Sequence, residues 1–260
     1  GVGDQLARIA VAVVIFNRTG SSTLTAVSYA VSYLPWLIGG PTLSVFADRL
    51  PHRTVMIACD SGRSALVCLI AIPRCPTLCV IGLVALVALL QPPFTSARAA
   101  LVPEIVGEGE SYTAASTLTN TTLQIAVLAG FGLGGALVAL LGTGLTVVVD
   151  GLTFIASTCV IAGFVARRQA TAGRTSSWRS ELSAGWTVVF ASQQLRQLVT
   201  LSWILVGTVI VTEAIAVPYA NAHGEGATAA GFLTASMPMG TAAVALVLGR
   251  AKIGRAACRG

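Results

Sequence analysis

Carboxyl groups stand inside long apolar stretches of this sequence. Asp4, Asp150 and Glu213 each lie within such a stretch. A charge at the centre of a bilayer costs roughly 2.5–3.5 kcal/mol on insertion scales, so an acid retained there suggests a use. A low-dielectric site disfavours the charged form of a carboxyl group, and small changes around it can therefore load or release a proton. These acids predict proton binding as the chemistry of the chain.

Two arginines lie close to acids within the same stretches. Arg8 follows Asp4 by one helical turn, so we expect it to share the face of Asp4 and to neutralise it. Arg8 therefore joins the candidate proton-coupling residues. Asp60 and Arg63 are three residues apart, and we expect a local ion pair between them. Glu213, in contrast, has no basic residue near it in the sequence.

Other kinds of chemistry lack the residues that they need. The six cysteines and two histidines have no paired metal spacing and no nucleophile stands beside a base, so we expect no metal, no cofactor and no enzyme activity. Residues 130–135 read G-F-G-L-G-G, a spacing that elsewhere binds dinucleotides, but such a site needs a preceding strand and a downstream acid. We interpret Gly130, Gly134 and Gly135 as positions where a neighbouring helix approaches closely.

The elements that must hold these residues are apolar runs separated by polar gaps. A spanning helix needs roughly 17–25 mostly apolar residues, and all runs but the first reach that length. Barrel strands would alternate apolar and polar residues, which these runs do not. With 55% hydrophobic and 10% charged residues, the sequence predicts an all-α polytopic transmembrane helical bundle. The eight runs are Gly1–Phe16, Thr23–Phe46, Val55–Ile72, Leu78–Ala97, Ser116–Leu141, Gly144–Phe164, Leu198–Tyr219 and Thr228–Leu248.

Positive charge concentrates in every second gap and in the C-terminal tail, whereas the other gaps hold only Arg18 and Arg74. Lys and Arg are retained on the cytoplasmic side of a membrane, so both termini are predicted to lie in the cytoplasm. The net charge of +6 then reflects topology in a cell membrane, with the lipid bilayer as partner and no nucleic acid. The basic residues in these alternate gaps and in the tail are Arg49, Arg53, Arg98, Arg167, Arg168, Arg174, Arg179, Arg196, Arg250, Lys252, Arg255 and Arg259.

One gap, at residues 166–197, is long, polar and basic, and it divides the chain. We expect residues 1–165 to form a six-helix transmembrane bundle and residues 198–260 to form two further helices and a basic tail. Within the gap, apolar residues at helical spacing predict an amphipathic helix at the membrane interface. They are Trp178, Leu182, Trp186, Val189 and Phe190.

Residues 44–53 read S-V-F-A-D-R-L-P-H-R. They resemble the signature G-x-x-x-D-R-x-G-R-R that the major facilitator superfamily carries in the loop between its second and third helices. Asp48, Arg49 and Arg53 match this signature, whereas two of its glycines and one arginine are replaced. Residues 130–135 also resemble the G-P-x-x-G-G of the drug-exporting, proton-exchanging branch, with Phe131 in place of the proline.

The resemblance implies a secondary transporter with twelve helices in two six-helix halves, which exports small amphipathic molecules in exchange for protons by alternating access. It also implies a cytoplasmic gate loop made by Asp48, Arg49 and Arg53, which latches the two halves together. Since only eight runs are present, we expect a truncated copy that needs a second chain to supply the missing helices. The alternative is a non-transporting membrane remnant or an accessory subunit.

Overall fold

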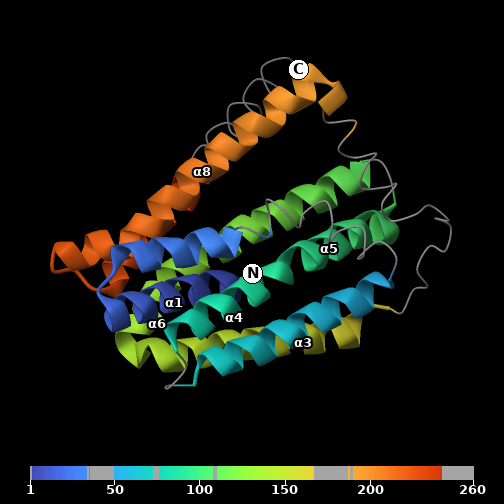
Figure 1. The fold of residues 1–260 in the computed structure, drawn as a ribbon. Helices are drawn as coiled ribbons and strands as arrows, with labels where there is room; N and C mark the ends of the chain where they lie inside the picture. The colour runs from blue at the N-terminus through green and yellow to red at the C-terminus, as the bar shows by residue number, and fades with distance from the viewer. Residues whose placement is uncertain are drawn as a thin grey trace, which may run out of the picture.

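The computed structural model describes residues 2–33, 35, 50–72, 76–107, 110–166, 187 and 190–241, and within these residues every regular element is a helix (Figure 1). The predicted all-α class is therefore confirmed. The bounded helices are α1 (Val2–Thr19), α3 (His52–Ile70), α4 (Thr77–Leu89), α5 (Gln91–Val106), α6 (Glu110–Phe164) and α8 (Gln193–Ala222). Two further helical segments cover residues 22–33 and 227–241.

Three helical stretches of the described chain are long and apolar enough to cross a membrane: Thr77–Pro103, Ser111–Phe164 and Gln193–Ala222. Large apolar side chains also point away from the bundle. Leu78, Leu118 and Leu140, for example, are 79%, 69% and 82% exposed. In water such a surface would aggregate, whereas lipid tails are as apolar as leucine. The exterior of the bundle is thus built for a membrane.

The long helix α6 contains two of the predicted runs. Its backbone departs from helical geometry at Gly142, where φ is 76° and ψ is 167°. This region of conformational space is open essentially to glycine alone, because a Cβ atom would clash with the backbone. Gly142 therefore separates the two arms of α6. It lies in the short gap between the predicted runs that end at Leu141 and begin at Gly144.

The run predicted at Leu78–Ala97 differs from a single straight helix. α4 ends before Leu90, and α5 begins at Gln91 with prolines in its first turn, where a missing N–H interrupts no helical hydrogen bond. α5 then continues to Val106, beyond the predicted end of the run. The break matters for the site described below, because Leu90 and Gln91 both contact charged side chains of other helices.

Helix α1 lies at the centre of the bundle and packs chiefly against α6 (Figure 1). The main apolar core gathers around it and includes Ile9 and Ile15 of α1, Val67 of α3, and Phe131 and Val147 of α6. Each of these side chains is at most 2% exposed. A charged side chain carried by α1 is consequently surrounded by other helices.

Within the described chain, helix α8 buries side chains only in its C-terminal half. Figure 1 shows its N-terminal half leaning away from the other helices. All of its buried residues lie between Glu213 and Ala220, whereas Leu198, Trp203 and Ile204 are more than half exposed. The contact between α8 and the other described helices is therefore made close to Glu213.

Several predicted features lie outside the described residues. These are Asp48 and Arg49 of the gate loop, most of the 166–197 gap, and the basic tail. Of the predicted amphipathic stripe, Phe190 is described, and its side chain is 60% exposed.

Candidate functional site

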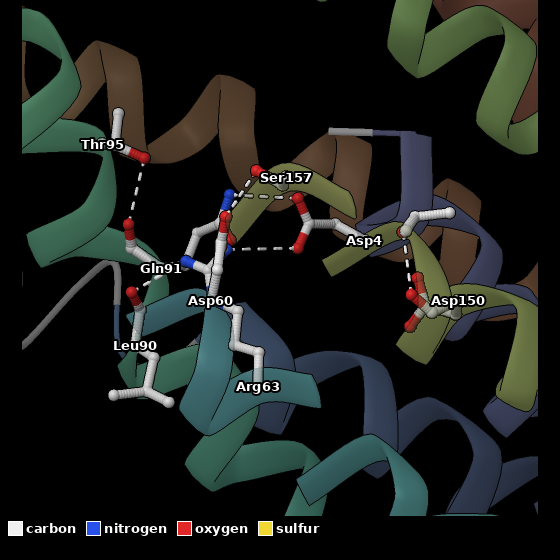
Figure 2. A network of polar contacts seen from close by, with 9 residues as sticks. Asp4, Asp60, Arg63, Leu90, Gln91, Thr95, Asp150 and Ser157 are labelled. Atoms are coloured by element: carbon white, nitrogen blue, oxygen red, sulfur yellow. Dashed lines mark hydrogen bonds and ion pairs between the residues drawn. The ribbon is translucent and has the colours of Figure 1, made fainter. Parts of the chain in front are cut away.

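Arg63 of α3 is the centre of a buried polar network (Figure 2). Its side chain is 1% exposed, and Nη2 donates a 2.7 Å hydrogen bond to the carbonyl oxygen of Leu90. Nη1 lies 3.4 Å from Asp60 Oδ1, so the predicted local ion pair is present. The guanidinium also lies over the rings of Phe94 and Phe154, 4.9 and 5.6 Å from their centroids. A cation so enclosed by protein is held by its neighbours rather than by water.

Asp60 is also bonded to α6. Its Oδ2 accepts a 2.6 Å hydrogen bond from Ser157 Oγ, and the residue is 1% exposed. One turn further along α3, Ser64 Oγ donates to the carbonyl oxygen of Gly151 at 3.2 Å. Helices α3 and α6 therefore approach closely along a polar seam, and Asp60 has partners on both helices.

Asp4 of α1 lies close to the same nitrogen of Arg63. Its Oδ1 lies 3.8 Å from Arg63 Nη1, and its Oδ2 accepts a 3.5 Å hydrogen bond from Gln91 Nε2. The sequence predicted that Arg8 would neutralise Asp4, but the ion pair seen here joins Asp4 to Arg63. The reason is tertiary, because α3 packs its only buried cation against the start of α1 (Figure 2).

Asp150 of α6 lies beside this network, close enough to interact electrostatically with Asp4 and Arg63, but it differs from the other acids. The residue is 0% exposed, and neither carboxyl oxygen has a hydrogen-bond partner in the described part of the chain. Gly3 covers it so closely that a Cβ atom there would collide with Oδ1. Transferring a polar group out of water without a partner costs several kcal/mol, and an ionised carboxylate costs far more than a neutral acid. An ionised carboxylate at this position would receive no compensating hydrogen bond from the described residues.

A second polar cluster joins the bundle to α8. Arg8 Nη1 lies 3.8 Å from Glu213 Oε2, and the hydroxyl of Tyr33 donates a 2.7 Å hydrogen bond to the same oxygen. The Arg8 guanidinium stacks over the Tyr33 ring at 4.2 Å from its centroid. Glu213, which lacked a basic neighbour in the sequence, thus receives one from α1.

A cavity of about 50 Å³ lies between the two clusters. Asp4, Arg8 and Gln91 line it together with apolar side chains from α3, α4 and α6. A water molecule needs roughly 10–15 Å³ of such space, whereas drug-sized ligands occupy pockets of roughly 300–1,000 Å³. In this conformation the cavity has room for water and is too small for a drug-sized substrate.

Two of the predicted packing glycines, Gly134 and Gly135, lie at close helix contacts. Gly130 is buried, and a Cβ atom on Gly134 would lie 3.3 Å from side-chain carbons of both Leu6 and Ile9 of α1. A Cβ atom on Gly135 would lie 2.5 Å from the carbonyl oxygen of Ala227 and 3.0 Å from Gly231 Cα. The packing interpretation of Gly134 and Gly135 therefore agrees with the structure, and the neighbours are α1 and the segment 227–241.

Of the predicted gate-loop residues, the described one is Arg53. Its Nη2 donates a 2.5 Å hydrogen bond to the carbonyl oxygen of Ala162, close to the C-terminal end of α6. Cations are favoured there because the last carbonyls of a helix have no intrahelical donor. Arg53 therefore ties the start of α3 to the end of α6.

Three residues of these clusters were missed by the sequence reasoning: Tyr33, Gln91 and Ser157. Each is a polar side chain in an otherwise apolar run, which is a usable signal, since membrane helices place such groups toward other helices. Their spacing alone could not say which acid each would meet. Within the residues searched, no group of three or more His, Cys, Asp or Glu side chains could hold a metal ion.

Comparison with known proteins places this arrangement in a family. The profile of the Major Facilitator Superfamily matches residues 2–258. A comparison with curated proteins found no match. The matched range contains every helix described above, including both polar clusters and the glycine contacts of α6. The chain therefore belongs to the Major Facilitator Superfamily, whose members are membrane transporters.

Proposed function

We propose that this transporter exports small amphipathic molecules and that each export step is coupled to proton entry. The observation that carries the proposal is Asp150, an acid at the centre of the bundle whose carboxyl group is fully buried and has no hydrogen-bond partner among the described residues. A carboxyl group in such a place can hold a proton in one conformation and lose it in another that admits water.

The surroundings of Asp150 support this role. Asp4 and Asp60 share the cation Arg63, and both also accept hydrogen bonds from neutral side chains. Both acids therefore have a cation and a hydrogen-bond donor beside them, whereas the carboxyl group of Asp150 has no hydrogen-bond partner among the described residues. The cavity beside Asp4 has room for water, which is what a proton path to the network requires.

The proposed cycle is alternating access. Residues 1–165 form one bundle, and the substrate cavity opens alternately to the two sides between this bundle and a second one, to which α8 and the segment 227–241 belong. We further propose that the protein lies in the cell membrane with both termini in the cytoplasm, as the distribution of Lys and Arg predicts.

Proteoliposomes that hold the full chain and trapped pyranine test the coupling. A pH gradient is imposed, and three amphipathic probes are added in turn: ethidium, N-phenyl-1-naphthylamine and 8-anilinonaphthalene-1-sulfonate. At least one probe is expected to accelerate proton movement in the wild type. Asp150→Asn is expected to reduce this acceleration about tenfold or more, because an amide cannot carry the proton.

Glu225→Gln is the matched control for this test. Glu225 is exposed in the turn that follows α8, so loss of its charge should leave probe-driven proton movement unchanged. Retention of full proton movement by Asp150→Asn, or no response of the wild type to any of the probes, would overturn the proposal.

A further inference from the structure

The cluster around Glu213 has the composition of a site for an organic cation. Glu213 supplies a carboxylate that is 7% exposed, and Tyr33 supplies an aromatic ring beside it. A carboxylate and a ring face together attract a cation by charge and by the ring quadrupole, and the attraction is strongest where water is excluded. In the described conformation, the cation between them is the guanidinium of Arg8.

We infer that Glu213 and Tyr33 form the binding site for an organic cation of the guanidinium or quaternary ammonium class, and that Arg8 occupies this site when no substrate is bound. This inference rests on the proposed function, because it names the substrate class of the transporter. It makes Arg8 a built-in competitor: a substrate must displace its guanidinium to reach the ring and the carboxylate.

The contact distances suit a displaceable occupant. Arg8 Nη1 lies 3.8 Å from Glu213 Oε2, beyond the 2.7–2.9 Å of a charge-assisted hydrogen bond. The short bond to that oxygen comes instead from the hydroxyl of Tyr33, at 2.7 Å. Tyr33 therefore holds the carboxylate in position, while Arg8 balances its charge through a longer and weaker contact.

Asp4 is a second acid with which the guanidinium of Arg8 can pair. Asp4 lies one turn before it on α1, and both residues line the same cavity. A guanidinium that leaves Glu213 can thus move toward Asp4 without losing all compensation of its charge. Displacement by a substrate then moves a positive charge toward the network of Asp4 and Arg63, which links the cation site to the proton site.

The buried hydroxyl group of Tyr29 is a second, independent observation that supports a ligand site here. Its side chain is 2% exposed, and its hydroxyl has no hydrogen-bond partner among the described residues. It lies close enough to interact electrostatically with both Glu213 and Arg8. Buried hydroxyl groups are normally hydrogen-bonded, so one without a partner beside a charged pair is available to a ligand.

The test compares two probes of equal size and opposite charge. Tetraphenylphosphonium and tetraphenylborate are each titrated into the purified full chain in nanodiscs of neutral lipid. Binding in excess of that to protein-free nanodiscs is measured by equilibrium dialysis without any pH gradient. The wild type is expected to bind the phosphonium more tightly than the borate. Equal binding of both ions, or preference for the borate, would overturn the inference, since Arg8 rather than Glu213 would then recognise the ligand.

Variants of the two charged residues should act in opposite directions. Glu213→Gln is expected to weaken phosphonium binding about tenfold or more, because the carboxylate is lost. Arg8→Gln is expected to strengthen it about tenfold, because the internal competitor is gone and the ring and the carboxylate are free. A purely structural ion pair would give weaker binding in both variants, and that result would contradict the inference.

Variants of Tyr33 and a measurement of Tm distinguish a loss of binding from a loss of folding. Tyr33→Phe keeps the ring and should stay within about threefold of the wild type, whereas Tyr33→Leu should weaken binding further. Arg8→Gln leaves the Glu213 carboxylate without its cation, so the Tm of this variant should fall. The phosphonium should then raise the Tm of the variant more than it raises the Tm of the wild type. No stabilisation of Arg8→Gln by the phosphonium would count against the site.

The outcome is separable from that of the proposed function. Charge-selective binding that depends on Glu213, together with full proton coupling in Asp150→Asn, would overturn the coupling and leave the cation site standing. Proton movement that depends on Asp150 and is driven only by the neutral or the anionic probe, with phosphonium binding unchanged in Glu213→Gln, would overturn the cation site alone.

Discussion

Ser157 of α6 donates a 2.6 Å hydrogen bond to Asp60 of α3, and this bond joins the two helices at the wall of the Arg63 network (Figure 2). Asp60 is thereby held on two sides, by the hydroxyl of Ser157 and by the guanidinium of Arg63. The arrangement fixes the position of the carboxylate, so removal of either partner should be measurable.

Ser157→Ala should destabilise the protein through the loss of this bond. Hydrogen bonds to charged groups contribute about 1.5–3 kcal/mol in soluble proteins, whereas bonds between membrane helices average about 0.6 and reach about 1.7 kcal/mol. The expected loss is near the upper membrane value, because the acceptor is a buried charge. The free energy of unfolding in SDS measures it.

Ser202→Ala is the control for this prediction. Ser202 Oγ donates only to Leu198 O of its own helix, on the exposed half of α8, so its removal should change stability by less than about 0.5 kcal/mol. Equal effects of the two variants would show that the contact between α3 and α6 contributes nothing specific.

Arg63→Gln should be the most damaging single change in the network. It leaves the carboxylates of Asp4 and Asp60 buried without the cation that they share, and breaking a buried pair in this way costs about 3–5 kcal/mol. The Tm of the purified protein should fall strongly, whereas Arg196→Gln on the exposed face of α8 should leave it unchanged.

A double substitution tests the cause of that loss. When Asp4→Asn and Asp60→Asn are combined with Arg63→Gln, no carboxylate remains opposite the missing guanidinium, so part of the lost stability should return. A triple variant that is less stable than Arg63→Gln alone would mean that packing around the arginine, rather than its charge, is what matters.

Gly135→Ala should separate α6 from the segment 227–241. The added Cβ atom would lie 2.5 Å from the carbonyl oxygen of Ala227, and a backbone atom cannot move aside as a flexible side chain can. We expect a loss of about 1–3 kcal/mol, measured as a lower midpoint of SDS unfolding. Gly132→Ala is the control in the same helix, since nothing among the described residues lies within 4 Å of its Cβ position, and it should be neutral or stabilising.

The two ends of α8 should lie on opposite sides of the membrane. In a cysteine-free background, Glu225→Cys at the outer end should react with a membrane-impermeant maleimide added to intact cells. Gln193→Cys, at the end close to Arg196, should react only after the membrane is permeabilised, because Lys and Arg remain on the cytoplasmic side. Labelling in the reverse pattern would contradict the predicted orientation.

Much of the fold could be predicted because hydropathy is summed along a segment. The all-α class, the spans of α3 and α8, and the short turn at Gly142 follow from runs of apolar residues and one glycine. The division of the fourth run at Leu90 was not predicted, because the prolines that follow it are equally compatible with a bend inside a single helix. The amphipathic helix of the 166–197 gap and the orientation of the chain remain predictions.

The sequence by itself determined that acids are buried in a membrane bundle and that Asp60 meets Arg63, since residues three apart on a helix are neighbours whatever surrounds them. Only the tertiary structure decided that Asp4 pairs with Arg63, that Arg8 pairs with Glu213, and that Asp150 has no partner in the described chain. Those outcomes depend on how each helix is rotated against its neighbours. Because α6 and α8 are apolar on nearly all sides, their sequences carry little periodic signal from which that rotation could be predicted.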